Sequence, residues 1–347
     1  MSNETLQDAP LVSVVTACHN AEPFVAETIE SVLAQTYRAV EQILVDDAST
    51  DGSWSVIERY TAAHPDRVRA LRLETNRGGC FARNRGAEQA RGELLMFLDA
   101  DDLISPDSIA ALVEVVRDVP RGIAIGGWLH LEERDGAWVE VVGGVPDPSG
   151  DQLWAWLDGR GSPTCSVLWR RDAYDLTGGW DEALAYDQDS DVTHRALALG
   201  AQLAQAEGGI GYYRRHGKSR ASVSTTVSAR KLESWMKVTE NLEQLLERQG
   251  RLEAYAEKLG EGYHAAALLG FQQGFNEVAR ECLRRAEAHG VTHPGSGKRV
   301  GRMLERMIGL EQKERLIQWL ARRGIATRDR RETLAEHEAL RSDGPAA

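Results

Sequence analysis

Three aspartates stand directly after an apolar stretch, and their spacing suggests a cation site. Residues 94–98 are all apolar, and Asp99, Asp101 and Asp102 follow within four positions. An apolar run of this length is typical of a buried strand. Carboxylates this close repel one another unless a cation is near, and oxygen ligands suit Mg²⁺ or Mn²⁺. An acidic strand-to-helix loop with Asp as a helix cap explains the same residues equally well.

The first 120 residues alternate between strand and helix patterns. Strands are predicted at 11–17, 40–45, 68–73 and 94–98, and helices at 24–33, 53–63 and 81–90. Asn20 can cap the first helix, and Ser105, followed by Pro106, is predicted to cap a further one. This alternation is typical of an α/β fold with a mostly parallel sheet and helices on both faces.

The pattern changes after about residue 122. A pair of strands, a short helix at 151–158, a strand at 165–169, a helix at 187–199 and a last strand at 209–214 follow in turn. Beyond residue 222 the apolar residues fall at helical spacing, with a helical hairpin around Gly274. We therefore expect an α-helical C-terminal region after the sheet.

Composition excludes several classes of protein. The net charge is −12, which makes nucleic acid an unfavourable partner, and hydrophobic residues make up 42% of the chain. Four cysteines lie far apart without a CxxC pair, which favours reduced thiols. No apolar run approaches the roughly 18 residues of a membrane span. A cytoplasmic protein, peripheral at most on the inner face of a membrane, is the expectation.

Three acidic or polar loops follow predicted strands and can meet at one edge of the sheet. Residues 16–20, the pair Asp46 and Asp47, and residues 99–102 then line one crevice. No GxGxxG follows the first strand, which argues against a dinucleotide site. The sequence PGSGKR at 294–299 lacks the spacing and the preceding strand of a P-loop. A nucleoside diphosphate suits the crevice, because its phosphates need a metal and its base and ribose can donate to carboxylates.

Five motifs in this order resemble family 2 glycosyltransferases. They are VSVVTACHN, LVDDASTDGS, NRGGCFARNRGAEQARGELLMFLDADD, GGWDEALAYDQDSDVTHRAL and YYRRHGKSRAS, which together span roughly residues 11–222. The resemblance implies a GT-A (nucleotide-diphospho-sugar transferase) fold with a Rossmann-like, mostly parallel sheet, and transfer of a sugar with inversion. It divides the chain into a catalytic domain at 11–222, with a donor half to about 120 and an acceptor half beyond, and a helical region at 223–332. Residues 1–10 and 333–347 are expected to be disordered.

The resemblance also implies roles for residues of the donor half. Thr16 and Ala17 would border the base, Asp46 would accept from a base N–H, and Asp99 would reach the ribose. Asp101, with Asp102, would hold the Mn²⁺ or Mg²⁺ that bridges the two phosphates, with His216 near the metal or the diphosphate. Three further residues complete the implied donor set: Asn20, Gly78 and Arg83, the last through phosphate.

The acceptor half supplies the implied catalytic base. The family usually carries a Glu-Asp pair at the start of a helix, and this chain has Gln188 and Asp189 there. Asp189 is assigned as the base that takes the proton of the acceptor hydroxyl, since a free Asp is ionised at neutral pH. Gln188 departs from the pattern, so Asp187 or Asp191 could partly replace the missing carboxylate.

Several alternatives stay open at this stage. A nucleotidyltransferase also uses a parallel sheet and a metal, and a non-catalytic protein that binds sugar nucleotides is compatible with Gln188. UDP is the favoured nucleotide, with dTDP and GDP open, and the acceptor is a saccharide, a lipid-linked group or a small molecule in polysaccharide or glycoconjugate biosynthesis. Four tryptophans could stack on a sugar or pack in the core: Trp154, Trp156, Trp169 and Trp180.

The basic region at about 298–331 has two interpretations. Lys and Arg flank an amphipathic pattern there, within an otherwise acidic chain. Such a segment can lie on anionic lipid, as a lipid-linked acceptor would require. It can equally pack on the catalytic domain or on a second copy of the chain in a homodimer.

Overall fold

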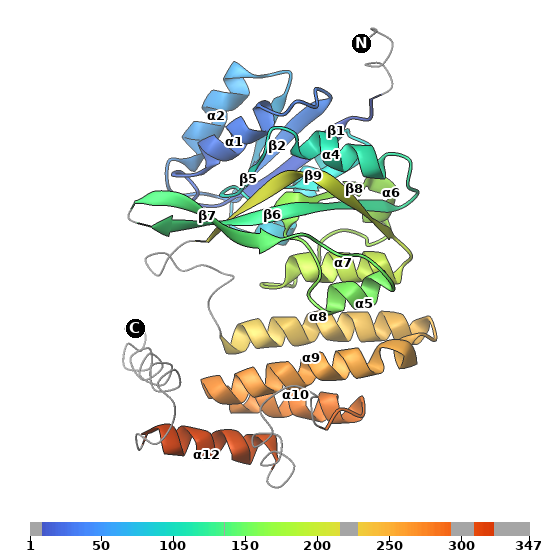
Figure 1. Cartoon of the computed structure of the whole chain (residues 1–347). Coiled ribbons are helices and arrows are strands. Elements are labelled where there is room, and N and C mark those ends of the chain that lie inside the picture. Colours follow the sequence, from blue (N-terminus) through green and yellow to red (C-terminus); the bar gives the residue numbers. More distant parts are fainter. Residues whose placement is uncertain (1–8, 135, 216–227, 293–308, 323–347) are drawn as a thin grey trace. The chain divides into compact units, whose positions relative to one another are not determined.

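The computed structural model describes residues 9–134, 136–215, 228–292 and 309–322 (Figure 1). The chain forms two compact units, Met1–Thr226 and Val227–Ala347. The first unit holds the sheet and the second is helical among its described residues.

One nine-stranded sheet organises the first unit. Its strands are β1 (Val12–Cys18), β2 (Val40–Asp46), β3 (Val68–Arg72), β4 (Leu94–Phe97), β5 (Leu103–Ile104), β6 (Gly122–Arg134), β7 (Ala137–Gly144), β8 (Val167–Arg170) and β9 (Gln202–Arg215). The order across the sheet is β3-β2-β1-β4-β8-β6-β9-β5, with β7 paired to β6. Strands β3, β2, β1 and β4 are parallel, whereas β8 is antiparallel to both β4 and β6. The predicted α/β class with a mostly parallel sheet is confirmed.

Helices cover both faces of the parallel half because its strands are apolar on both sides. The helices of this part are α1 (Val25–Leu33), α2 (Ser53–Ala63), α3 (Gly79–Gln89) and α4 (Ser108–Val116). Along β2, Leu44 packs with residues of α1 and α2, while its neighbours Ile43 and Val45 pack with Ala82 of α3. A Cβ on Gly86 would lie 2.3 Å from Val15 Cγ1, so glycine lets α3 approach β1 closely.

The parallel register brings the ends of three strands together. Cys18 is opposite Asp46 in the pairing of β1 with β2, and Val15 is opposite Phe97 in the pairing of β1 with β4. The loops that follow these strands therefore begin at one edge of the sheet. They contain the aspartates and the asparagine that the sequence singles out.

The remaining elements of the first unit build the acceptor half. They are α5 (Gln152–Leu157), a 3₁₀ turn at Thr164–Ser166, α6 (Arg171–Asp175) and α7 (Gln188–Ala198). Asp151 caps α5 by accepting from Trp154 N at 2.9 Å. Strands β6 and β7 form the predicted antiparallel pair.

Three local predictions are wrong. Asn20 does not cap α1, which begins at Val25 without a side-chain cap; Asn20 has a positive φ of 51° and its Oδ1 accepts from Thr50 N at 2.8 Å. Helix α4 begins at Ser108 rather than at Ser105, because the Ser105 hydroxyl instead bonds Asp107 and Ile210 N. Strand β9 begins at Gln202, seven residues before the predicted start, since it pairs with β6 along most of its length.

The second unit contains four described helices: α8 (Ala229–Arg248), α9 (Leu252–Gln273), α10 (Asn276–Ala288) and α12 (Leu310–Arg322). Ser228 caps α8, and Gly274, with a φ of 79°, ends α9 in the left-handed conformation. Tyr263, Phe271 and Cys282 are buried in the core that these helices share. None of the helices within the described ranges is both long and apolar enough to cross a membrane.

Candidate active site

Asp46 ends β2 at the functional edge and is completely buried. Its Oδ2 lies 3.2 Å from Arg72 Nε and accepts from Ser49 N at 3.3 Å. Its Oδ1 is buried and has no hydrogen-bond partner among the described residues. Thr16 is buried beside it on β1 and accepts from Gln42, while Ala17 is half-buried. The contact of these three residues with a base stays a prediction.

Asp47 and Asn20 tie the loops of this edge to one another. The carboxylate of Asp47 accepts from Arg77 N at 2.7 Å and from Gly78 N at 2.8 Å. Gly78 has a φ of 88°, which favours glycine at the start of α3. Asn20 links the loop after β1 to Thr50 in the loop after β2. Asp47 therefore has a structural role: its carboxylate holds the loop that contains Gly78.

Asp99 and Arg83 form the central ion pair of the site. Arg83 Nη2 lies 2.5 Å from Asp99 Oδ1, with the arginine side chain 12% exposed and the aspartate 31%. The same guanidinium donates from Nη1 to Gln188 Oε1 at 2.9 Å and lies 4.7 Å from the centre of the Trp180 ring. Burial lowers the pKa of Arg83, but the charges of Asp99 and Asp189 outweigh it and raise this pKa. Arg83 thus connects the donor half to the start of α7.

Asp102, three residues after Asp99, is fully buried. Its Oδ1 accepts from Arg214 N at 2.9 Å, while its Oδ2 has no hydrogen-bond partner among the described residues. Burial raises the pKa of Asp102 well above its ordinary range, and the charges of Asp101 and Asp99 add to this increase. A cation at this loop would relieve both effects.

The fit of a divalent metal to this loop can be judged from the donor atoms. The described His, Cys, Asp and Glu side chains form no group of three that could hold a metal ion. Mg²⁺, however, is commonly bound by one or two carboxylates together with substrate phosphates. The orphaned Oδ2 of Asp102 and the neighbouring half-buried Asp101 fit that mode. His216 lies outside the described residues.

Arg214 anchors the end of β9 against this acidic loop. Its side chain is 1% exposed and pairs with Glu27 of α1. The guanidinium lies 5.2 Å from the ring centres of both Phe24 and Trp138. Together with the bond from its backbone N–H to Asp102, these contacts fix the last described residues of β9 beside the aspartates.

Asp189 occupies the first turn of α7, two positions after a residue with strained backbone. Asp187 precedes the helix with a φ of 55°. Asp189 is exposed as a whole residue, yet desolvation by the surrounding protein raises the pKa of its carboxyl group. The N–H of Ser190 opposes this increase, the charge of Asp99 adds to it, and Arg83 opposes it. The side chain is therefore accessible and electrostatically linked to the donor loop.

Neither Gln188, which is an amide, nor Asp191 supplies a second free carboxylate beside Asp189. Gln188 bonds Arg83 and, through Nε2, the carbonyl oxygen of Leu184 at 3.0 Å. Asp191 is buried and pairs with Arg195 at 2.5 Å. The suggestion that Asp191 replaces the missing glutamate is therefore not supported by its position.

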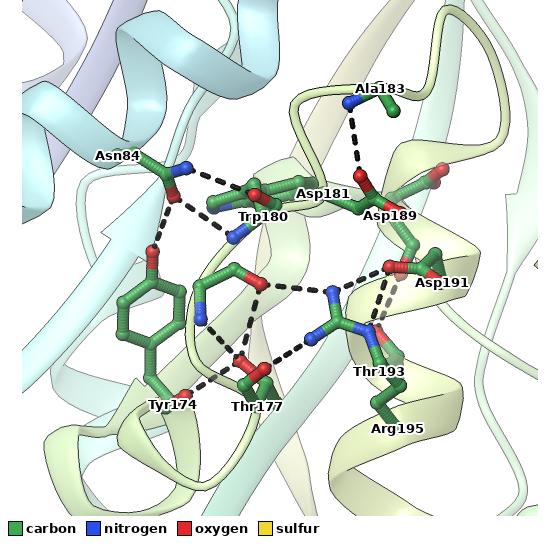
Figure 2. Close-up of polar contacts among 11 residues, drawn as sticks. Asn84, Tyr174, Thr177, Trp180, Asp181, Ala183, Asp189, Asp191, Thr193 and Arg195 are labelled. Atoms are coloured by element: carbon green, nitrogen blue, oxygen red, sulfur yellow. Dashed lines mark hydrogen bonds and ion pairs between the residues drawn. The ribbon is translucent and has the colours of Figure 1, made fainter. Parts of the chain in front are cut away.

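A network of hydrogen bonds fixes the loop that carries Trp180 (Figure 2). Asn84 of α3 accepts from Trp180 N and donates to Trp180 O, each at 2.9 Å. Arg195 of α7 donates to the carbonyl oxygens of Thr177 and Gly179. The loop is thus held between α3 and α7, with the Trp180 ring against Arg83.

A small cavity lies beside Asp189. Its lining residues are Phe97, Ser162, Thr164, Val167, Trp169, Trp180, Asp189, Val192 and Thr193. Its volume is about 10 Å³, on the scale of a single water molecule. Trp169 and Trp180 are 3% and 4% exposed, so both pack in the core rather than present an open stacking surface.

The sequence did not single out Arg195, which helps to hold this site together. Arg195 pairs with Asp191 at i,i+4 spacing on a helix, a pattern that could have identified it. The role of Asn84 is structural, and its partners lie about a hundred positions away in the sequence.

Comparison with known proteins identifies the domain. Residues 13–177 match the family model described as Glycosyl transferase family 2. This part of the chain is a family 2 glycosyltransferase domain, as the motifs predicted. Glycosyltransferase GlyG of Streptococcus pneumoniae is 34% identical over 134 residues, which are 39% of this chain and 44% of that protein. The succinoglycan biosynthesis protein ExoO of Rhizobium meliloti is 38% identical over 136 residues, 39% of this chain and 36% of that protein.

The chain thus spans less than half the length of these two relatives, whereas its likeness to solved structures is more extensive. The crystal structure of S. aureus TarS 1-349 in complex with UDP-GlcNAc has a TM-score of 0.62 and 18% identity, covering 92% of this chain and 93% of that one. The crystal structure of GalNAc-T7 with UDP, GalNAc and Mn²⁺ has a TM-score of 0.53 and 18% identity, and the match covers 67% of this chain and 48% of that one. These likenesses concern the fold, and the predicted GT-A type is confirmed.

Proposed function

We propose that this chain is an inverting glycosyltransferase that moves a sugar from a nucleoside-diphosphate donor to a hydroxyl group of an acceptor. The observation that carries the proposal is the position of Arg83, which contacts Asp99 at the donor edge and Gln188 at the start of α7. This contact supports the grouping of Asp189 and the donor loop in one site. The family 2 match at residues 13–177, which includes Arg83 and Asp99, supports sugar transfer as the chemistry.

The reaction follows from the roles of these side chains. The acceptor hydroxyl oxygen forms a bond to the anomeric carbon, and the bond from that carbon to the diphosphate oxygen breaks. Asp189 takes the hydroxyl proton as the new bond forms. Attack from the face opposite the leaving diphosphate inverts the configuration of the anomeric carbon. In this reaction Asp46 accepts a hydrogen bond from the base of the donor and Asp99 contacts the ribose.

A divalent cation, Mn²⁺ or Mg²⁺, completes the proposed site. Asp101 and Asp102 would hold it, with His216 nearby. The bound ion would stabilise negative charge on the leaving diphosphate. The orphaned Oδ2 of Asp102 and the raised pKa of that residue support a cation at this loop.

The donor and acceptor classes are proposed from the relatives. A UDP-sugar is favoured, because TarS and GalNAc-T7, which share the fold, were crystallised with UDP-GlcNAc and with UDP. The acceptor is proposed to be a saccharide or a lipid-linked group in polysaccharide biosynthesis, since a matched relative is named for succinoglycan biosynthesis.

We further propose a peripheral contact with the inner face of a membrane through the basic C-terminal region. Leu316 and Trp319 of α12 are 37% and 47% exposed, and they supply apolar surface within a segment whose sequence is basic. The predicted amphipathic pattern at 300–308 lies outside the described residues. A homodimer through the same region is the alternative.

Release of nucleoside diphosphate tests the proposed function. The full chain is incubated with UDP-, dTDP- and GDP-sugars, Mn²⁺ and a panel of saccharide and lipid-linked acceptors, and products are identified by mass spectrometry. We expect release that depends on donor and acceptor, that stops with a chelator, and that falls at least tenfold in Asp101→Asn. Pyrophosphate release would indicate a nucleotidyltransferase. Tight donor binding by calorimetry without turnover would indicate a binding protein.

A further inference from the structure

Gln188 stands where the family resemblance leads one to expect glutamate, and both ends of its amide are used. Its Oε1 accepts from Arg83 Nη1 at 2.9 Å, and its Nε2 donates to the carbonyl oxygen of Leu184 at 3.0 Å. A carbonyl oxygen only accepts hydrogen bonds. The contact with Leu184 therefore determines which end of the amide faces Arg83.

An ionised glutamate at position 188 would not make the same two contacts. Both of its oxygens are acceptors, so one of them would face the Leu184 carbonyl oxygen with no proton between them. The neutral amide satisfies a donor on one side and an acceptor on the other. The amide of Gln188 therefore fits the donor and the acceptor around it better than the expected glutamate would.

The Arg83 guanidinium is held on several sides at this point. Asp99 Oδ1 lies 2.5 Å from Nη2, and the Trp180 ring centre lies 4.7 Å from the guanidinium carbon. A Cβ at Gly79 would lie 2.8 Å from Arg83 Nη1 and 3.4 Å from Gln188 Oε1, so a larger residue there would crowd the contact. Helix α3, the end of β4 and the start of α7 therefore meet at one guanidinium.

We propose that Gln188 is a positioning residue for the transfer reaction: by holding Arg83 against Asp99, its amide fixes the donor loop and the start of the base helix in one arrangement. This inference rests on the proposed function, which assigns Asp99 to the donor and Asp189 to the proton. Because Gln188 is neutral, the positive charge of Arg83 interacts with the carboxylates of Asp99 and Asp189 and is not neutralised by residue 188.

The charges around Asp189 make the role of this amide measurable. Asp99 from the end of β4 and Arg83 from α3 act on Asp189. Its acidic neighbours in the sequence are Asp187, just before α7, and Asp191, within α7. Asp191 is already paired with Arg195. A negative charge at position 188 would act on Asp189 directly and would also neutralise Arg83, so both effects favour the protonated carboxyl.

The first test compares Gln188→Glu with Gln205→Glu, an identical change at an exposed position on β9. The acid limb of kcat/KM against pH should move to higher pH by about 1 unit in Gln188→Glu, and stay unchanged in the control. The side-chain carboxyl of Asp189, followed by ¹³C NMR without substrate and assigned with Asp189→Asn, should show the same shift. An unchanged NMR midpoint in Gln188→Glu would overturn the inference.

This pair of readouts separates the inference from the proposed function. If the wild-type chain transfers sugar from no donor, the proposed function fails, while the NMR titration still decides whether position 188 is electrostatically coupled to Asp189. If transfer occurs and the Asp189 midpoint does not move, the function stands and the inference fails.

A double-mutant cycle tests whether Gln188 acts through Arg83. Gln188→Ala should lower kcat/KM about tenfold in the wild-type chain, but about twofold or less in an Arg83→Ala background, because residues that act together are not additive. Thermal unfolding confirms that each variant is folded, and Arg83→Lys replaces Arg83→Ala if the latter does not fold. If Gln188→Ala lowers kcat/KM by the same factor with and without Arg83, Gln188 does not act through Arg83 and the proposed link between the two residues is contradicted.

Discussion

Asp189 lies in a mixed electrostatic environment, and this environment sets the pH at which it can accept a proton. Desolvation by the surrounding protein and the negative charge of Asp99 raise the pKa of Asp189. The backbone N–H of Ser190 and the positive charge of Arg83 lower it, but the net change is an increase. A free Asp titrates at about 3.9. A proposed base with a raised pKa is better matched to neutral pH than a free Asp.

The first prediction concerns the pH dependence of transfer. The proposed base must be ionised to act, so kcat/KM should fall as the pH drops through the raised pKa of Asp189. The acid limb should therefore lie above the value of about 3.9 for a free Asp. Initial rates of nucleoside diphosphate release between pH 3.5 and about 8 measure it. A limb at or below the free value would argue against Asp189 as the base.

At the scale of elements, one buried carboxylate ties together the starts of β1, β2 and β4. Glu41 is 2% exposed and accepts from Ser13 Oγ at 2.7 Å, Arg91 N at 2.8 Å and Arg91 Nη2 at 2.7 Å. Arg69 lies 3.1 Å away. Burial alone would raise the pKa of Glu41, but the bonds from Ser13 and Arg91 and the charge of Arg69 lower it overall.

The second prediction is that Glu41→Gln destabilises the fold at neutral pH by about 2 kcal/mol, because a buried charged hydrogen-bond acceptor is lost. The folded state lowers the pKa of Glu41, so this stabilisation is present above the unfolded value of about 4.3 and is lost as the pH falls. Urea unfolding at pH 7 and at pH 3.5 should show a difference from wild type that narrows at the lower pH.

A matched control for this prediction is Glu88→Gln. Glu88 pairs with Arg85 on the surface of α3, with side chains 51% and 38% exposed. An exposed pair contributes about 0–1 kcal/mol. Equal destabilisation by the two variants, or an effect of Glu41→Gln that does not depend on pH, would contradict the role given to Glu41.

The parallel half could be predicted from the sequence because its strands are apolar runs separated by helical patterns. Local capping could not be predicted as well, since Ser105 has two competing partners, one of them Ile210. The motifs singled out Asp99 and Asp189, but no local pattern shows that Arg83 joins their loops. That contact connects positions 105 residues apart, and it exists only once the two halves of the sheet are paired.

At the scale of the whole molecule, the chain combines a family 2 domain with a separate helical unit. The second unit has its own core around Tyr263 and Phe271. On α12, Gln318 donates to the Phe271 carbonyl oxygen at 2.7 Å, whereas Trp319 is 47% exposed. An exposed tryptophan near basic residues is the kind of surface that interfacial helices present to lipid.

The third prediction concerns this surface. The full chain should sediment with vesicles that contain anionic lipid and stay in solution with neutral vesicles, because apolar burial and charge attraction act together. Trp319→Glu should reduce binding at least threefold. Val142→Glu, at an apolar position on β7 that is 89% exposed, should leave binding unchanged. Equal binding by all three proteins would end the membrane proposal.

The most direct test of the central claim compares nucleoside diphosphate release by the wild-type chain and by Asp189→Asn, with the donor and acceptor found by screening. Asparagine keeps the shape of the side chain but cannot take the proton. The account predicts that kcat falls by about 10²–10⁴-fold in Asp189→Asn, while calorimetry shows unchanged donor affinity. A variant that retains wild-type kcat, or that loses donor binding together with activity, would contradict the assignment of Asp189 as the base.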